Sequence, residues 1–520
     1  MNLRPAALSS SFGIFASFAT LRDAICFSRK VAKEAKIARM TLVVGVALAL
    51  GPAAIAQVPF VTSPAPKFTD AERHAELSRR RSAAADKLAD NSLLILLSAE
   101  PKIYTNDVDY KFRQQNDLYY LTELEQKNAV LVISKRAGKV TEFIFVPKPD
   151  ATNETWNGHM YTFAEAAGVS GIRDVRDAAT WNAYFRSLLP KARSGYQRIY
   201  LLNKMPENTD DANGEREFRR EHALAKQLVG YKIQDAGPIF AELRQIKSPY
   251  EQAMLQHAVD ISIEAHERSW LAAGIATMEY ERQAEAEYIF RKRNADFWGY
   301  PSIVGCGANA TTLHYEESQG PVRKGDLCLM DVGAEYGHYS ADVTRTFPVS
   351  GKFSKEQADI YQIVYDAQDA VARAAKPGTT ILDLSNAASE VITDGLLKLG
   401  LMTTRDELQL RVWYMHDYGH WLGMNVHDVS SSWSLQPGMT FTNEPGIYIR
   451  EDALDNLPDT PANREFKERV RPAFERYRNI GVRIEDDMLV TNDGVRWMTA
   501  ALPRKMSEIE SFMATNRKIN

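Results

Sequence analysis

The feature that most constrains this chain is a pair of carboxylates in the segment "MDVGAEYGHYSADVTRTF", residues 330–347. Its Val, Tyr and Phe content predicts two short strands, yet Asp331 and Asp342 stand where apolar residues would pair better. If Tyr336 and Gly337 form a two-residue hairpin loop, the two aspartates face each other with Cβ atoms roughly 4.5–5.5 Å apart. Two bare carboxylates at that separation repel each other and lose hydration, so a positive group must lie between them.

The positive group has more than one candidate identity. Arg345 or a protonated aspartate gives a structural answer, whereas one or two divalent metal ions would account for both carboxylates at once. Three further fragments, "YMHDYGHWLGMNVHD", "FTNEPGIYI" and "IGVRIEDD", also set polar residues into otherwise apolar strands or turns. One such histidine or glutamate is commonly a core or solvated residue, but the whole set indicates a metal site. That set is two Asp, one His and two Glu, and the three fragments hold His416, His420, His427, Glu444, Arg483 and Glu485.

His416 and His420 also match the H-x-x-x-H spacing of helical zinc proteases. That interpretation fails on composition, because Asp417 replaces the general-base glutamate and two glycines, Gly419 and Gly423, disfavour a helix here. An oxygen-rich ligand set with one imidazole favours a harder ion such as Mn²⁺, although Co²⁺ or Zn²⁺ can occupy such a site.

Bulk composition excludes several classes of protein. The 520 residues, 45% hydrophobic and 25% charged, are typical of a globular protein of two or three domains. The formal net charge of -4 shows no excess of positive charge that would attract nucleic acid, so no nucleic-acid partner is expected.

A leader is predicted at the start of the chain, residues 1–56. A basic stretch precedes an apolar run of 17 residues from Met40 to Ala56, which ends in Ala54-Ile55-Ala56 and fits cleavage before Gln57. The run is marginal for spanning ~30 Å of hydrocarbon, so export to the periplasm or medium is expected rather than membrane anchoring. Initiation nearer Met40 is an alternative start of the chain.

The cysteines suggest no disulfide framework. The sequence holds three, and Cys26 belongs to the predicted leader. Cys306 and Cys328 lie in apolar, strand-like contexts without a C-x-x-C or Cys/His pattern, so we expect buried structural thiols.

Two domains are expected after the leader. Residues 57–240 alternate helical patterns with the apolar strands "NSLLILLS", "AVLVIS", "EFIFVP" and "QRIYLLN", which predicts an α/β domain. Ser248, Pro249 and Glu251 then form a capping box that opens a long helix, and the second domain runs over residues 241–510.

With these motifs the sequence resembles the pita-bread metallopeptidases of family M24, in the aminopeptidase P and prolidase branch. The segment "YKFRQQNDLYYLTEL…NAVLVIS" is similar to the branch's non-catalytic N-terminal domain, and the metal-ligand motifs appear in the family's order. The resemblance implies an α/β N-terminal domain followed by an α+β pita-bread catalytic domain. It also implies two divalent metal ions, with Asp342 and Glu485 bridging both. The implied ligands are Asp331, Asp342, His420, Glu444 and Glu485.

The same resemblance implies how the site works. Two bound ions would lower the pKa of a shared water and present it as hydroxide to the peptide carbonyl, and Glu444 would carry the proton of that water to the leaving proline nitrogen. His314, in "TTLHYEES", and His427 hold the carbonyl and stabilise the oxyanion. Arg483 orients a ligand carboxylate. His416 and Tyr300 line the substrate site.

Two activities within the branch remain open. An Xaa-Pro aminopeptidase removes the residue before proline from longer peptides, whereas prolidase cuts only Xaa-Pro dipeptides. The segment between His427 and Glu444 is short and lacks the arginine with which prolidase-like chains grip the dipeptide carboxylate, which favours the aminopeptidase. The charged segment 451–478, expected on the surface, and Arg450 favour prolidase instead. A remote alternative is a metal-free creatinase-like or non-catalytic binding relative, which would have lost ligands that this chain keeps.

Trp156, in "NETWNGHM", belongs to a loop-like stretch of the N-terminal domain. One hypothesis makes it an ordinary buried tryptophan. The resemblance implies instead that it reaches the active-site mouth of a neighbouring subunit, and so predicts a homodimer or homotetramer acting on peptides with proline in second position.

Overall fold

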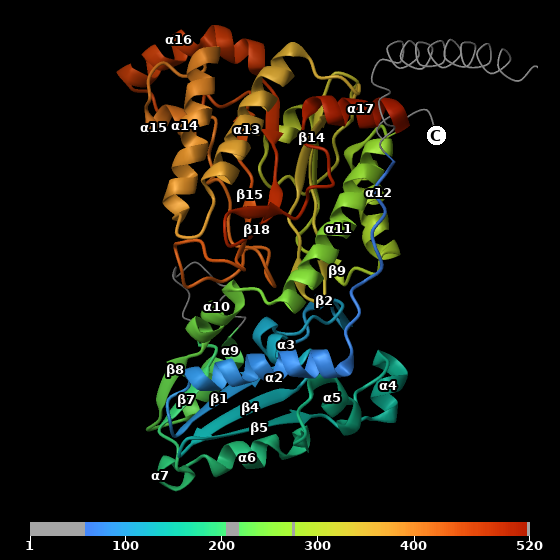
Figure 1. Cartoon of the computed structure of the whole chain (residues 1–520), viewed down its shortest axis with the longest axis vertical. Coiled ribbons are helices and arrows are strands. Elements are labelled where there is room, and N and C mark those ends of the chain that lie inside the picture. Colours follow the sequence, from blue (N-terminus) through green and yellow to red (C-terminus); the bar gives the residue numbers. More distant parts are fainter. Residues whose placement is uncertain (1–57, 204–217, 273–275, 517–520) are drawn as a thin grey trace, which may run out of the picture. The chain divides into compact units, whose positions relative to one another are not determined.

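The computed structural model describes residues 58–203, 218–272 and 276–516 (Figure 1). The predicted leader, residues 1–56, lies outside these described residues. None of the described helices has the length and apolar character that crossing a membrane requires.

The first part of the described chain, up to Gln245, contains a six-stranded sheet in the order β6-β5-β4-β1-β7-β8. The four apolar segments expected to be strands form β1, β4, β5 and β7, so the α/β prediction is confirmed for this part. Its helices are α2 (Asp70–Lys87), α3 (Asn116–Thr122), α4 (Ala151–Asn157), α5 (Phe163–Ser170), α6 (Trp181–Ser187), α7 (Lys191–Ser194), α9 (Arg219–Gln227) and α10 (Gly237–Gln245). Its strands are β1 (Ser92–Leu97), β2 (Ile103–Thr105), β3 (Val108–Asp109), β4 (Val130–Arg136), β5 (Lys139–Val146), β6 (Val175–Asp177), β7 (Arg198–Leu201) and β8 (Lys232–Asp235).

Successive side chains of a strand point to opposite faces of a sheet. Both faces of this sheet are buried, as the side chains of β1 show. In β1, Leu94 and Leu96 pack with residues of α2 and α3. Leu93 and Ile95 pack on the other face with residues of α6 and α9. The continuous apolar runs seen in the sequence therefore reflect helices on both sides of the sheet.

The second part contains several small antiparallel sheets and, in or next to their strands, the predicted carboxylate ligands. Helices α11 and α12 lie side by side, as do α13 and α14 (Figure 1). The helices are α11 (Pro249–Leu271), α12 (Glu279–Lys292), α13 (Lys355–Ala374), α14 (Ile381–Leu399), α15 (Glu407–Arg411), α16 (Pro461–Tyr477) and α17 (Met506–Asn516). The strands are β9 (Phe297–Trp298), β10 (Ile303–Cys306), β11 (Leu327–Asp331), β12 (Ala334–Tyr336), β13 (Tyr339–Ser340), β14 (Thr344–Pro348), β15 (Thr440–Asn443), β16 (Gly446–Ile449), β17 (Ile480–Arg483), β18 (Asp486–Val490) and β19 (Val495–Trp497).

Two local predictions can be compared with the elements directly. The capping box at Ser248 is present, since its hydroxyl accepts a hydrogen bond from the Glu251 N–H and the Glu251 carboxylate accepts one from the Ser248 N–H. The charged segment 451–478 contains α16, a helix at the surface that buries one face through Phe466, Val470 and Phe474. Spacing of four residues places these three side chains on the same stripe.

The hairpin that carries the two aspartates has a different register from the one predicted. Its loop is Gly337-His338, a type I′ turn with φ of 57° and 66°, so Tyr336 pairs with Tyr339. Asp331 lies opposite Thr344, and the prediction that it faces Asp342 directly is wrong. Asp342 lies two residues before Thr344, between β13 and β14, and so stands diagonal to Asp331 rather than opposite it.

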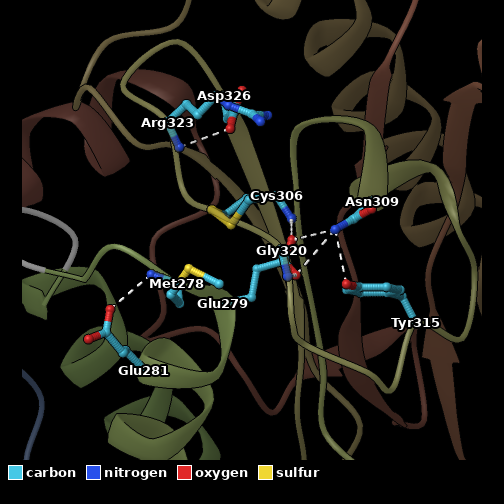
Figure 2. The surroundings of a disulfide bond; sticks show 10 residues. Met278, Glu279, Glu281, Cys306, Asn309, Tyr315, Gly320, Arg323 and Asp326 are labelled. Atoms are coloured by element: carbon cyan, nitrogen blue, oxygen red, sulfur yellow. Dashed lines mark hydrogen bonds between the residues drawn. A yellow bond between two sulfur atoms is a disulfide. The ribbon is translucent and has the colours of Figure 1, made fainter.

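The prediction that Cys306 and Cys328 are free thiols is also wrong, because they form a disulfide (Figure 2). Strands β10 and β11 pair in a register that sets the two cysteines directly opposite each other, with Cα atoms 4.0 Å apart. A bond between cysteines 22 residues apart stabilises a folded chain by roughly 2–4 kcal/mol, since it restricts the unfolded chain.

Candidate metal centre

Four of the five predicted metal ligands stand where strands end or are interrupted. Asp331 is the last residue of β11, and Asp342 lies between β13 and β14. Glu444 follows β15 and Glu485 separates β17 from β18. His420 lies in a non-helical stretch, and its carbonyl accepts a hydrogen bond from the Thr442 N–H of β15. Interruptions of this kind re-aim side chains, which is why they recur beside active sites.

The structure brings these ligands together. One oxygen or nitrogen from each of Asp342, His420 and Glu485 lies within 4.8 Å of the others, as in a metal-binding group. The Nε2 atom of His420 is 3.3 Å from Asp342 Oδ2 and 3.3 Å from Glu444 Oε1. Asp331 is held 2.5 Å from Arg483, which in turn lies 3.9 Å from Glu485.

The electrostatics of the centre favour a bound cation. Burial, followed by the charges of Asp342 and Glu444, raises the pKa of Glu485 well above its usual range. Burial and the charge of Asp331 raise the pKa of Asp342. Burial disfavours the charged form of His420, but the hydrogen bond to Asp342 and the charge of Glu444 outweigh it and raise the imidazole pKa to about 9. A set of oxygen donors that repel one another, together with one imidazole, fits hard or borderline divalent ions.

Asp331 is oriented by two neighbours. Arg483 donates from Nη2 to Asp331 Oδ2 at 2.5 Å, and the Tyr300 hydroxyl donates to Asp331 Oδ1. Burial and the nearby carboxylates raise the pKa of Tyr300 well above its usual range, so this phenol stays a donor. The structure thus places Tyr300 against a predicted ligand, where the sequence predicted a residue lining the substrate site.

A chain of hydrogen bonds leads from the ligands to His416. Arg483 donates from Nη1 to the Tyr448 hydroxyl at 2.7 Å, and His416 Nε2 lies 2.8 Å from the same oxygen. Burial lowers the pKa of His416, which is therefore neutral near pH 7. Tyr448 is wholly buried and couples the position of His416 to that of Asp331.

His314 and His427 stand on the open side of the centre. Both side chains are exposed, whereas Asp331, Asp342 and Glu485 are buried. The rings of His427 and His420 have centroids 4.1 Å apart. Partial desolvation, together with His420 and His314, lowers the pKa of His427 to about 4, so its imidazole is neutral at pH 7.

Sequence reasoning missed several residues that support the ligands. The Thr344 hydroxyl donates to Glu485 at 2.6 Å, and the Thr442 hydroxyl donates to Glu444 at 3.0 Å. Buried Asp487 accepts a hydrogen bond from the Asp342 N–H at 3.2 Å. Thr344, Thr442 and Asp487 each lie two residues from a predicted ligand, so strand alternation was an available signal. Tyr448 carried no comparable signal.

Trp156 lies away from these buried groups, in α4. Its side chain is 82% exposed, and α4 has no buried residue. The hypothesis of an ordinary core tryptophan is therefore wrong.

Comparison with known proteins agrees with the fold. Residues 253–492 match metallopeptidase family M24, and residues 77–199 match the aminopeptidase P N-terminal domain. The Xaa-Pro aminopeptidase of Haemophilus influenzae is 34% identical over 449 residues, which cover 84% of this chain and 97% of the relative. The Xaa-Pro aminopeptidase of Escherichia coli is 33% identical over 455 residues, covering 85% and 98%. The structure of E. coli aminopeptidase P with the inhibitor Pro-Leu has a TM-score of 0.74 and 32% identity, covering 87% of this chain and all of that one.

The two-domain arrangement and the cluster of carboxylates with one imidazole define a metallopeptidase of the pita-bread type. Within that class the chain belongs to the Xaa-Pro aminopeptidases of family M24. The predicted fold class is confirmed.

Proposed function

We propose that this enzyme hydrolyses the peptide bond between the first residue of a peptide and a proline in second position. The observation that carries the proposal is the convergence of Asp342, His420 and Glu485 with Asp331 and Glu444. The names of the relatives, Xaa-Pro aminopeptidases over nearly their whole length, support the choice of substrate.

The metal proposal is specific about ligands. The donor set fits two divalent ions, which would be held by Asp331, Asp342, His420, Glu444 and Glu485, with Asp342 and Glu485 shared between them. Mn²⁺ suits the four carboxylates and single imidazole best, and Co²⁺ or Zn²⁺ are alternatives. When bound, such ions lower the pKa of water and polarise a peptide carbonyl.

Side chains of this chain supply the remaining chemistry. Glu444 takes the proton of the attacking water and passes it to the proline nitrogen as the C–N bond breaks. His314 and His427 donate hydrogen bonds to the carbonyl oxygen as it gains charge. Arg483 and Tyr300 fix the carboxylate of Asp331, and His416 lines the proline side of the site.

Arg450 provides an observation that favours the aminopeptidase over prolidase. Its guanidinium is engaged by the two carboxylate oxygens of Asp452, each at 3.0 Å. A guanidinium already neutralised in this way is a poor partner for the free carboxylate of a dipeptide.

The experiment that tests the proposal compares two substrates on the metal-loaded enzyme. An Xaa-Pro-Yaa tripeptide and the matching Xaa-Pro dipeptide are incubated separately, and release of the first residue is followed. We expect kcat/KM for the tripeptide to exceed that for the dipeptide by about tenfold or more, which corresponds to about 1.4 kcal/mol. Preference for the dipeptide would instead establish a prolidase, and cleavage of neither peptide would refute the proposal.

We propose further that Trp156 acts in a neighbouring subunit of a dimer or tetramer. An exposed aromatic face of this kind can pack against the early residues of a peptide and exclude water. Trp156→Ala is expected to lower kcat/KM about tenfold while metal content and Tm stay unchanged. The mass in solution is measured alongside, and a fully active monomer would contradict the cross-subunit role.

We also infer that the protein is exported. The Cys306–Cys328 disulfide supports this, because disulfides persist in oxidising compartments and are rare in the cytosol. N-terminal sequencing of the native protein is expected to find a chain that begins at Gln57 in the periplasm or medium. Recovery of residues 40–56 on membrane-bound protein would favour the anchor.

A further inference from the structure

The loop that carries His314 begins and ends at one buried carboxylate. It follows β10, includes a short 3-10 helix at Gly307–Thr311 and returns at Gly320. The carboxylate belongs to Glu279, the first residue of α12, whose side chain is wholly buried. Neither the sequence pattern nor the metal centre assigns Glu279 a role.

Glu279 binds the start and the end of this loop simultaneously (Figure 2). Its Oε1 accepts a hydrogen bond from the Cys306 N–H at 2.7 Å, and its Oε2 accepts one from the Gly320 N–H at 2.6 Å. The side-chain amide of Asn309, inside the loop, donates to the same carboxylate at 3.0 Å and contacts the Tyr315 hydroxyl at 3.0 Å. Tyr315 is the residue next to His314.

The backbone of Glu279 also binds the end of this loop. The Glu279 N–H donates to the Gly320 carbonyl at 3.0 Å, so these two residues are bonded in both directions. A Cβ atom at Gly320 would lie 2.7 Å from Glu279 Oε2 and 2.3 Å from Asn309 Nδ2. Position 320 therefore requires glycine to admit the carboxylate. Within the loop Ser318 has a φ of 48°, an unfavourable backbone conformation that persists only where its surroundings fix it.

The residues that Glu279 holds are also connected to the predicted metal centre. Cys306 is joined by its disulfide to Cys328 of β11, and Ile303 of β10 pairs with Asp331 at the end of that strand. Cys306, whose N–H donates to Glu279, is thus covalently joined to the strand that bears Asp331, a predicted ligand.

We propose that Glu279 is a positioning residue for His314: by binding Cys306, Asn309 and Gly320 together, it holds the loop where the His314 imidazole meets the substrate carbonyl. The inference rests on the proposed function. This role requires a carboxylate, because both of its oxygens accept hydrogen bonds. A glutamine amide has only one acceptor oxygen, and its NH₂ group would face an N–H donor.

The test is a double-mutant cycle between Glu279→Gln and His314→Ala on the metal-loaded enzyme, with an Xaa-Pro-Yaa tripeptide. Glu279→Gln is expected to lower kcat about tenfold or more, with KM changed less and metal content unchanged, since small misplacements of a catalytic group have effects of this size. In the His314→Ala background the same substitution is expected to lower kcat less than twofold.

The matched control is Glu281→Gln on the same helix. Glu281 caps α12 by accepting a hydrogen bond from the Met278 N–H at 2.8 Å, and no hydrogen bond links it to the loop among the described residues (Figure 2). This variant is expected to keep kcat within twofold of wild type. If Glu279→Gln fails to fold, Asn309→Ala replaces it in the cycle, with an expected loss in kcat of at least about threefold.

Each other outcome overturns the inference. Wild-type kcat in Glu279→Gln would show that the carboxylate plays no part in turnover. An equal loss in Glu281→Gln, or losses that multiply with His314→Ala, would show that Glu279 acts as general support. Full activity of His314→Ala alone would remove both His314 and the loop from catalysis. Failure of the proposed function is a separate result, since the wild-type enzyme would then leave the tripeptide intact.

Discussion

Asp331→Asn is expected to remove bound metal and activity together. The substitution keeps the shape of the side chain but removes the charge that a divalent ion requires, and it leaves Arg483 buried beside a neutral amide. Metal measured per chain is expected to fall, and kcat/KM to fall by at least about 100-fold, since even residues behind the ligands commonly contribute 10- to 100-fold.

The control for this variant is Asp455→Asn, an exposed aspartate whose loss should change neither quantity. Tm recorded without added metal separates loss of a ligand from loss of the fold. If Asp331→Asn retained full metal occupancy and normal turnover, the hairpin carboxylate Asp331 would not be a metal ligand.

His427→Ala is expected to lower kcat by about 100-fold or more while metal content remains intact. The side chain is exposed beside the half-buried predicted ligand His420, where it can donate a hydrogen bond to a carbonyl oxygen that gains charge. A donor that acts on the transition state lowers kcat when it is removed, whereas a donor that only binds substrate changes KM.

His74→Ala, in α2, serves as the control and is expected to keep kcat within twofold. A change in KM alone in His427→Ala would remove this residue from the transition-state role. Loss of metal would place it among the ligands instead.

The local features of this fold follow from residues close together in the chain. The apolar runs of β1, β4, β5 and β7 specify strands buried on both faces, and Ser248 with Glu251 specifies the start of α11. The candidate site residues were likewise predicted from short motifs, because a carboxylate or imidazole inside an apolar strand is costly unless a partner compensates for it. Thr344, Thr442 and Asp487 were within reach of the same reasoning through strand alternation.

Contacts between distant segments decided the rest. The hairpin turns at Gly337-His338 because His338 docks into the N-terminal part, where its ring stacks on Tyr119 at 3.7 Å and its Nδ1 lies 3.2 Å from Asn116 Oδ1. These contacts compensate for the left-handed φ of a non-glycine residue, which turn rules alone disfavour.

The disulfide shows the same division between sequence and tertiary structure. The sequence by itself determined that Cys306 and Cys328 lie in apolar strands, and it predicted a set of site residues. Whether the two cysteines meet depends on the register of β10 against β11, which is set by packing between segments far apart in the chain. The positions of Tyr448 behind Arg483 and of Glu279 beneath the His314 loop were decided in the same way, because each bridges segments that only the folded chain brings together.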